Sequence, residues 1–272
     1  MKEIKKIEDI HDVLFKSLCY FDDFCKENEL TYSLSNGTLL GAIKYNNFIP
    51  WDDDVDVIMP RDDYDKLMAL ISINTKNYRL LCKEQIPEWR MPYAKLISLD
   101  TYVKEGNYNF GVEIGLAIDI FPIDNWSSWF LGAVIQSLQC DILKRKLVFS
   151  IGGEFHTKQK GIKRLINKHL YLSGKRLGYE KIQQRLFKII QKSKKRKSKY
   201  SGCLAWTSHA YKEIFKSTIF EEKEYISFRN RAFPIIKKYE IYLNKLYGNW
   251  KKELPLEKQI SNHIIKVWWK NA

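Results

Sequence analysis

The sequence predicts a folded protein that mixes helices and strands, of the α/β or α+β class. Apolar residues recur at spacings of three and four between Ile7 and Cys25, which is typical of an amphipathic helix. Short apolar runs with adjacent turn signals predict strands at 55–60, 93–98 and 116–122. With 45% hydrophobic and 14% aromatic residues, the 272-residue chain can bury a sizeable core.

The chain is strongly basic, with 46 Lys and Arg against 32 Asp and Glu and a net charge of +14. This balance predicts an anionic partner: nucleic acid, an anionic membrane surface or a polyanionic small substrate. The five cysteines are scattered without a CxxC pair, so we expect neither a disulfide framework nor a zinc site. No signal peptide or membrane-spanning run is evident, and we expect a cytoplasmic protein.

Two parts of the chain differ in character. Residues 1–125 combine the first helix, a polar turn at 35–38, the strands and an acidic-capped helix at 61–72. Residues 126–272 are helix-prone and basic, and we expect a mainly helical region packed on the amino-terminal sheet. Two pairs of small residues should interrupt these helices: Gly152-Gly153 and Ser173-Gly174.

The segment WDDDVDVIMP concentrates acidic residues where a strand begins. Side chains alternate between the two faces of a strand, so Asp52, Asp54 and Asp56 should share one face while Val55 and Val57 occupy the other. Neighbouring carboxylates repel one another unless a cation lies between them, and oxygen ligands suit Mg²⁺ or Mn²⁺. The alternative is a solvated acidic turn.

Two further features favour the metal interpretation. Gly37 and Thr38 lie in a turn before a predicted helix, where backbone N–H groups can approach a phosphate closely. Asp119 lies within the apolar run LAIDIFP, and a buried carboxylate requires a partner. That partner is either a metal shared with Asp54 and Asp56 or a set of backbone donors.

These residues carry a resemblance to a known family. The segment NGTLLGAIKYNNFIPWDDDVDVIMPRDDYDKL resembles the signature of the LicD family of phosphotransferases, which is related to fukutin and fukutin-related protein. YAKLISLDTYV, IDIFPIDNW and the closing segment from FPIIKKYEIYL to VWWK resemble later blocks of that family in the same order. The resemblance is weakest between about residues 125 and 225.

The resemblance implies an α+β fold with a nucleotidyltransferase-like mixed sheet. It assigns the phosphate-binding turn to Gly37 and Thr38, the metal pair to Asp54 and Asp56, and the third carboxylate to Asp119. It also implies the reaction, which is transfer of a phosphorylated alcohol, most often phosphocholine from CDP-choline, to a sugar hydroxyl of lipopolysaccharide, teichoic acid or capsule. Relatives transfer ribitol phosphate from CDP-ribitol.

The chemistry of the residues agrees with that reaction. Mg²⁺ held by Asp54 and Asp56 could bridge the two phosphates of a CDP-linked donor, and Asp119 is the candidate base for the attacking hydroxyl. Lys44 and Lys95 either contact phosphate oxygens or are ordinary surface lysines. A choline group would favour aromatic side chains, yet core packing is the preferred interpretation of the candidates, which are Trp51, Trp89, Tyr93 and Trp126.

The chain departs from the family pattern at two places. Lys44-Tyr45 stand where members commonly have Arg-His, and the segment 259–263 has only one of the usual two histidines. His263 therefore remains a candidate for substrate contact, with a structural role as the alternative. The basic run 192–199 either contacts an anionic leaflet or acceptor, which would place the protein at the inner face of the membrane, or is a solvated helix end.

Two other classes of function compete with this one. A nucleotidyltransferase acting on RNA or an antibiotic would share the turn and the carboxylates but release pyrophosphate. A non-catalytic nucleic-acid-binding module would explain the positive charge and predict steep salt dependence, but it leaves the aspartates unexplained, so we expect no nucleic-acid partner.

Overall fold

The computed structural model describes residues 1–155, 160–207, 209–261 and 265–270. Its helices are α1 (Ile7–Glu27), α2 (Asn36–Tyr45), α3 (Arg61–Ala69), α4 (Phe130–Ser150), α5 (Gly161–Lys194) and α6 (Tyr239–Tyr247). Its strands are β1 (Lys2–Glu3), β2 (Ser33–Leu34), β3 (Val55–Pro60), β4 (Tyr78–Leu81), β5 (Ala94–Ser98), β6 (Thr101–Glu105), β7 (Ala117–Asn125), β8 (Tyr200–Gly202), β9 (Phe215–Lys216), β10 (Lys223–Phe228), β11 (Arg231–Ile236) and β12 (Ile265–Trp269).

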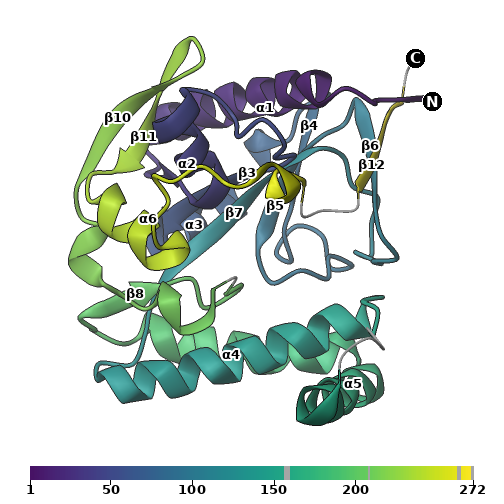
Figure 1. Ribbon diagram of the computed structural model, residues 1–272, viewed down its shortest axis with the longest axis vertical. Coiled ribbons are helices and arrows are strands. Elements are labelled where there is room, and N and C mark those ends of the chain that lie inside the picture. Colours follow the sequence, from purple (N-terminus) through teal and green to yellow (C-terminus); the bar gives the residue numbers. More distant parts are fainter. Residues whose placement is uncertain (156–159, 208, 262–264, 271–272) are drawn as a thin grey trace.

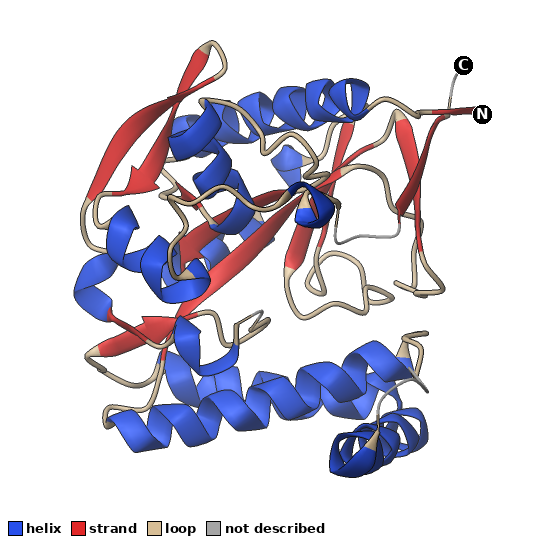
Figure 2. Ribbon diagram, in the orientation of Figure 1, coloured by secondary structure: helices blue, strands red, loops and turns tan. Residues whose placement is uncertain are grey.

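A mixed sheet in the order β10-β11-β2-β3-β7-β5-β4 forms the centre of the molecule (Figure 1). The β3–β7 and β2–β11 pairs are parallel, and the other pairs along this order are antiparallel. A smaller sheet has the order β1-β12-β6, and the short strand β8 pairs with the end of β7 and with β9. Helix α1 lies on one side of the central sheet, while α4 and α5 form a layer at the opposite end (Figure 2).

The central strands β3 and β7 are held by apolar side chains. Val55 and Val57 on β3 and Ile118 and Ile120 on β7 are fully buried. Parallel strands of this kind are typically covered on both faces, and continuous apolar residues are the sequence pattern that results. The buried valines and isoleucines therefore fix the register of the pair, because a slip by one residue would place them on the wrong face.

The predicted α+β fold is confirmed. The first helix, the strand at 55–60 and the strands near 93–98 and 116–122 lie where the sequence places them. The expected break at Ser173-Gly174 is wrong: α5 continues through it and departs from helical geometry at Gly178, with φ 74°. Gly174 instead allows close packing of α5 on α4, since a Cβ there would lie 2.5 Å from the Lys146 carbonyl oxygen.

The second half of the chain is not purely helical, because it also supplies strands that the sequence analysis did not predict. β11 pairs with β2 and β10 forms the sheet edge, while β12 joins the smaller sheet. The division into residues 1–125 and 126–272 stays a prediction. No helix in the described part of the chain has both the length and the apolar character needed to cross a bilayer.

A buried ionic network ties α1 to the β10–β11 hairpin. The fully buried carboxylate of Asp22 accepts hydrogen bonds from Tyr32, at 2.8 Å, and from Lys26, at 2.7 Å. The Arg231 guanidinium, at the start of β11, donates to both Asp22 and Asp23. Arg231 is thus the long-range partner whose positive charge offsets the free-energy cost of burying the Asp22 carboxylate.

Replacing Arg231 by alanine should destabilise the fold, because Asp22 would keep its burial but lose its nearest guanidinium. We expect the free energy of unfolding to fall by about 2 kcal/mol in urea denaturation. Arg79→Ala, at an exposed position on β4, is the matched control and should change it by less than about 0.5 kcal/mol. Equal effects of the two substitutions would contradict this role for Arg231.

Candidate active site

A cavity of about 620 Å³ opens beside β3 and β7, and most of the predicted site residues line it. These are Gly37, Lys44, Trp51, Asp54, Asp56, Lys95 and Asp119. Thr38 is buried and is not among the residues that line the cavity. His263 lies outside the described residues, so its predicted contact with substrate stays a prediction.

Two carboxylates face each other at the floor of the cavity. The parallel pairing of β3 and β7 sets Asp56 directly opposite Asp119. Burial and the negative charge of Asp119 raise the pKa of Asp56 to about 7, with Asp52 adding to the rise and a hydrogen bond from the Asn36 side chain opposing it. The fold therefore holds the carboxylates of Asp56 and Asp119 close together although their negative charges repel each other.

Lys95 provides the positive charge nearest to this pair. It lies opposite Asp119 on β5, and its Nζ donates to Asp119 Oδ1 at 2.5 Å. Burial opposes the charge on Lys95, but the carboxylates of Asp119 and Glu105 raise its pKa above the ordinary lysine value. The Tyr93 hydroxyl also hydrogen-bonds to Asp119, so both neighbours hold that carboxylate in one orientation.

The first turn of α2 is shaped around the acidic segment. A Cβ on Gly37 would lie 2.4 Å from Asp52 Oδ2, so only glycine leaves room for that carboxylate where it lies. The Thr38 hydroxyl accepts a hydrogen bond from the Asp56 backbone N–H at 2.9 Å, which fixes β3 against α2. Thr38 thus has a positioning role that the sequence did not reveal, and the predicted binding of phosphate by this turn stays a prediction.

Among the described residues, the anionic groups that line the cavity are carboxylates, and their oxygens suit a hard divalent cation such as Mg²⁺. In the described part of the chain, no three His, Cys, Asp or Glu side chains are grouped so as to hold a metal ion by themselves. Mg²⁺ needs only one or two protein carboxylates, because water and substrate phosphates complete its shell. The crowded charge of Asp56 and Asp119 fits a cation of this kind, and the metal assignment of Asp54, Asp56 and Asp119 stays a prediction.

The carboxy-terminal segment closes one side of the cavity. Lys44 at the end of α2 forms an ion pair with Glu253 at 2.8 Å, and the Tyr45 hydroxyl donates to the same carboxylate. Ser261 donates to Asp53 at 2.8 Å. The residues that depart from the family pattern at 44–45 are therefore joined to a segment more than two hundred positions away in the chain.

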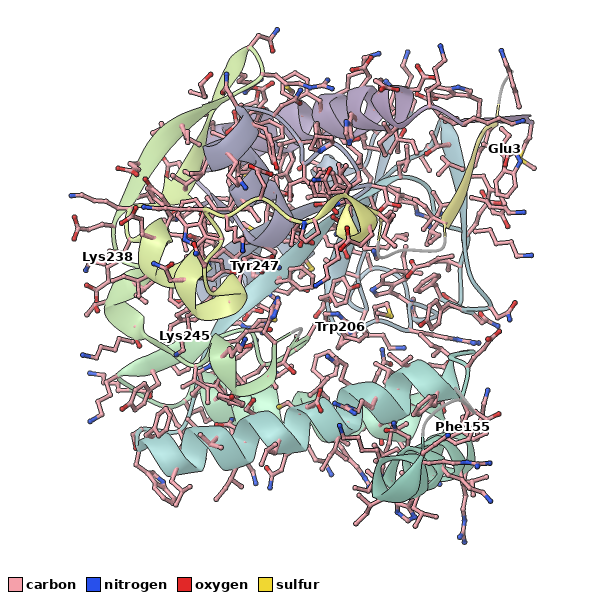
Figure 3. The ribbon with its side chains drawn as sticks, viewed as in Figure 1. Glu3, Phe155, Trp206, Lys238, Lys245 and Tyr247 are labelled. Atoms are coloured by element: carbon pink, nitrogen blue, oxygen red, sulfur yellow. The ribbon has the colours of Figure 1, made fainter. Side chains whose placement is uncertain are left out.

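Aromatic side chains form much of the remaining wall. Trp51 and Tyr93 line the cavity, whereas Trp89 and Trp126 are fully buried and belong to the core, as the packing interpretation predicted. Trp206 and Tyr247 also line it, and Figure 3 labels both. The rings of Tyr93 and Trp206 lie 5.4 Å apart, so segments from the two halves of the chain meet in this wall.

Several cavity residues escaped the sequence analysis. Asp52 had no assigned role; it precedes β3, and it lines the cavity together with Asp53, so the alternation expected of a strand does not extend to these two residues. Asn36 lies beside the predicted glycine turn, and it accepts a hydrogen bond from the Tyr242 hydroxyl at 3.0 Å. No local pattern marks Trp206 or Tyr247, because only the tertiary fold brings them to the cavity.

Comparison with known proteins gives two matches. A family model described as the LicD/FKTN/FKRP nucleotidyltransferase domain matches residues 29–137, the part that contains α2, β3 and β7. The chain is also 29% identical, over 270 residues, to the lipopolysaccharide cholinephosphotransferase LicD of Haemophilus influenzae. That alignment covers 94% of this chain and 95% of the relative.

Asp56→Asn should stabilise the metal-free protein at neutral pH. Because the pKa of Asp56 rises from 3.8 to about 7 on folding, its contribution to stability is present below pH 3.8 and is lost as the pH rises through about 7. Asparagine cannot ionise, so the variant does not lose this stability as the pH rises. We expect the free energy of unfolding to increase by about 2 kcal/mol at pH 8 and to change little at pH 4.

Thermal unfolding followed from pH 4 to pH 8 in the presence of a chelator measures this effect. Asp62→Asn, at an exposed position in the first turn of α3, is the matched control. A gain of stability that is the same at both pH values would contradict charge repulsion as its cause.

Proposed function

We propose that the chain is a phosphotransferase of the LicD family, and that it transfers phosphocholine from CDP-choline to a sugar hydroxyl of a bacterial cell-surface glycan. The observation that carries this proposal is the pair of facing carboxylates, Asp56 and Asp119, with Lys95 beside them in a cavity. Phosphoryl transfer depends on charge neutralisation and positioning, and this arrangement concentrates the groups that both require.

The reaction joins the sugar oxygen to the phosphorus of phosphocholine and breaks the bond from that phosphorus to the CMP oxygen, so that CMP leaves. In this proposal Asp119 accepts the hydroxyl proton, and Lys95 and Tyr93 hold its carboxylate in place. Asp54 and Asp56 would hold Mg²⁺, which would supply positive charge at the two phosphates of the donor.

The remaining walls position the donor and the acceptor. Lys44, whose Nζ is tied to Glu253, lies at the cavity edge and adds positive charge for a phosphate. Tyr93 and Trp206 offer aromatic faces to a quaternary ammonium, which binds such faces electrostatically.

The proposed acceptor rests on the similarity to the relative and not on a feature of the cavity. The relative named above is a lipopolysaccharide cholinephosphotransferase, which supports a lipopolysaccharide sugar as the acceptor of this chain. Transfer of another CDP-activated alcohol phosphate, such as ribitol phosphate, is the alternative that the aromatic wall disfavours, because ribitol carries no positive charge to bind there.

Substitution of the carboxylates that line the cavity should abolish transfer. With purified protein, CDP-choline, lipopolysaccharide and Mg²⁺, we expect Asp54→Asn, Asp56→Asn and Asp119→Asn each to lower the rate of CMP release at least a hundredfold. Chelation of the metal should do the same. Asp62→Asn is the control and should retain the original rate. Undiminished CMP release in Asp56→Asn, or pyrophosphate release from a nucleoside triphosphate, would contradict the proposed function.

Trp206→Ala should weaken the binding of CDP-choline specifically. Loss of the indole face removes a contact to the quaternary ammonium, so we expect KM for CDP-choline to rise about tenfold with a smaller change in kcat. The matched measurement uses the same variant with CDP-ribitol as the donor. We expect CDP-ribitol to be the poorer donor for both proteins, and its KM should change little on substitution. A parallel loss with both donors would show that Trp206 only supports the fold.

A further inference from the structure

The helical layer carries an unusual number of exposed apolar side chains. Among the described residues, ten of the twenty exposed large hydrophobic side chains lie between Trp129 and Leu172. Scattered single exposed apolar residues are normal in a water-soluble surface, but a concentration of this kind indicates an interaction surface. None of the ten lines the catalytic cavity described above.

The apolar residues of α4 form one continuous stripe. Its members share an exposed face at helical spacing and are Leu131, Ile135, Leu138 and Ile142. The buried residues of α4 that occupy the opposite face are Ala133, Gln136, Ser137, Cys140 and Leu147. Trp129 and Phe130, at the start of the helix, are also more than half exposed. One face of α4 therefore packs on the protein while the other presents apolar surface outward.

The first half of α5 carries a second set of exposed apolar residues. Its exposed members are Ile162, Leu165, Ile166 and Leu172. The two helices touch where Gly174 lies against Lys146 and where the rings of Phe149 and Tyr171 meet at 5.4 Å. Figure 1 shows both helices at the end of the molecule opposite α1. We call the eight residues of the two stripes the helical-layer surface.

Positive charge accompanies the helical-layer surface. Residues 161–179 contain five basic side chains and no Asp or Glu. Lys163, Arg164 and Lys168 are all exposed beside the apolar residues of α5. A second copy of the chain would bring these like charges face to face in a symmetric dimer, which opposes self-association. An anionic lipid surface instead attracts the basic residues while it accepts the apolar ones.

We propose that the helical-layer surface docks the protein on an anionic membrane leaflet, with the apolar stripes entering the headgroup region and the lysines and arginines contacting lipid phosphates. The aromatic residues Trp129 and Phe130 suit the same interface. The basic run 192–199 is not the centre of this surface, because Lys194 is bound to Asp65 and no exposed large hydrophobic residue lies within the run. The docking is independent of the proposed reaction.

Sedimentation with lipid vesicles tests this proposal. The full chain should sediment with vesicles of phosphatidylcholine and phosphatidylglycerol at least tenfold more strongly than with phosphatidylcholine alone. The double variant Leu138→Glu with Ile142→Glu, and separately Leu165→Glu with Ile166→Glu, should each weaken this binding at least tenfold. Lys163→Glu with Arg164→Glu and Lys168→Glu should remove the preference for the anionic lipid.

The matched control places the same charge on exposed apolar residues outside the helical layer, Ile71→Glu with Leu256→Glu, and should sediment like the original protein. Leu138→Ser with Ile142→Ser gives a second variant of the stripe if the glutamates impair folding, which circular dichroism monitors. The proposal is overturned if the original protein stays in the supernatant with both lipids, or if the stripe variants bind as it does. The proposal would also be overturned if the original protein is a dimer in analytical ultracentrifugation and the stripe variants are monomers.

Discussion

The parallel pairing of β3 with β7 is the constraint on which the rest of the structure depends. Buried valines and isoleucines fix its register, and that register sets Asp56 opposite Asp119. Two carboxylates so placed repel each other, and the free energy of the apolar packing offsets the repulsion. Lys95 on the adjacent strand β5 then compensates part of the charge. The cavity chemistry is thus a consequence of how the sheet is packed.

The surroundings of the pair are arranged around this charge. Gly37 leaves space for Asp52, Thr38 holds the backbone of Asp56, and Asn36 bonds to the Asp56 side chain. Such an arrangement costs stability in the absence of a cation, as functional sites often do. A metal ion with a phosphate-rich donor would relieve this repulsion, which connects the electrostatics of the site to the proposed transfer.

Much of this could be predicted from the sequence where the pattern is local. The pattern of WDDDVDVIMP predicted the strand at 55–60, and the lone Asp119 in an apolar run predicted a second strand with a buried carboxylate that needs a partner. Long-range contacts left no such pattern. The pairing of β11 with β2, the contact of Trp206 with Tyr93 and the bond from Ser261 to Asp53 join distant segments through tertiary packing alone. The break at Gly178 was missed because Ser173-Gly174 gave the more obvious signal.

The central claim is that Asp54 and Asp56 hold a divalent ion that contacts the phosphates of a CDP-linked donor. Paramagnetic relaxation of the two ³¹P resonances of CDP-choline by Mn²⁺ tests it most directly, because the effect falls steeply with the distance from the metal to each phosphorus. The account predicts strong broadening of both resonances with the original protein, well above that with Mn²⁺ alone, and its loss in Asp56→Asn. Equal broadening in the two proteins would contradict the account.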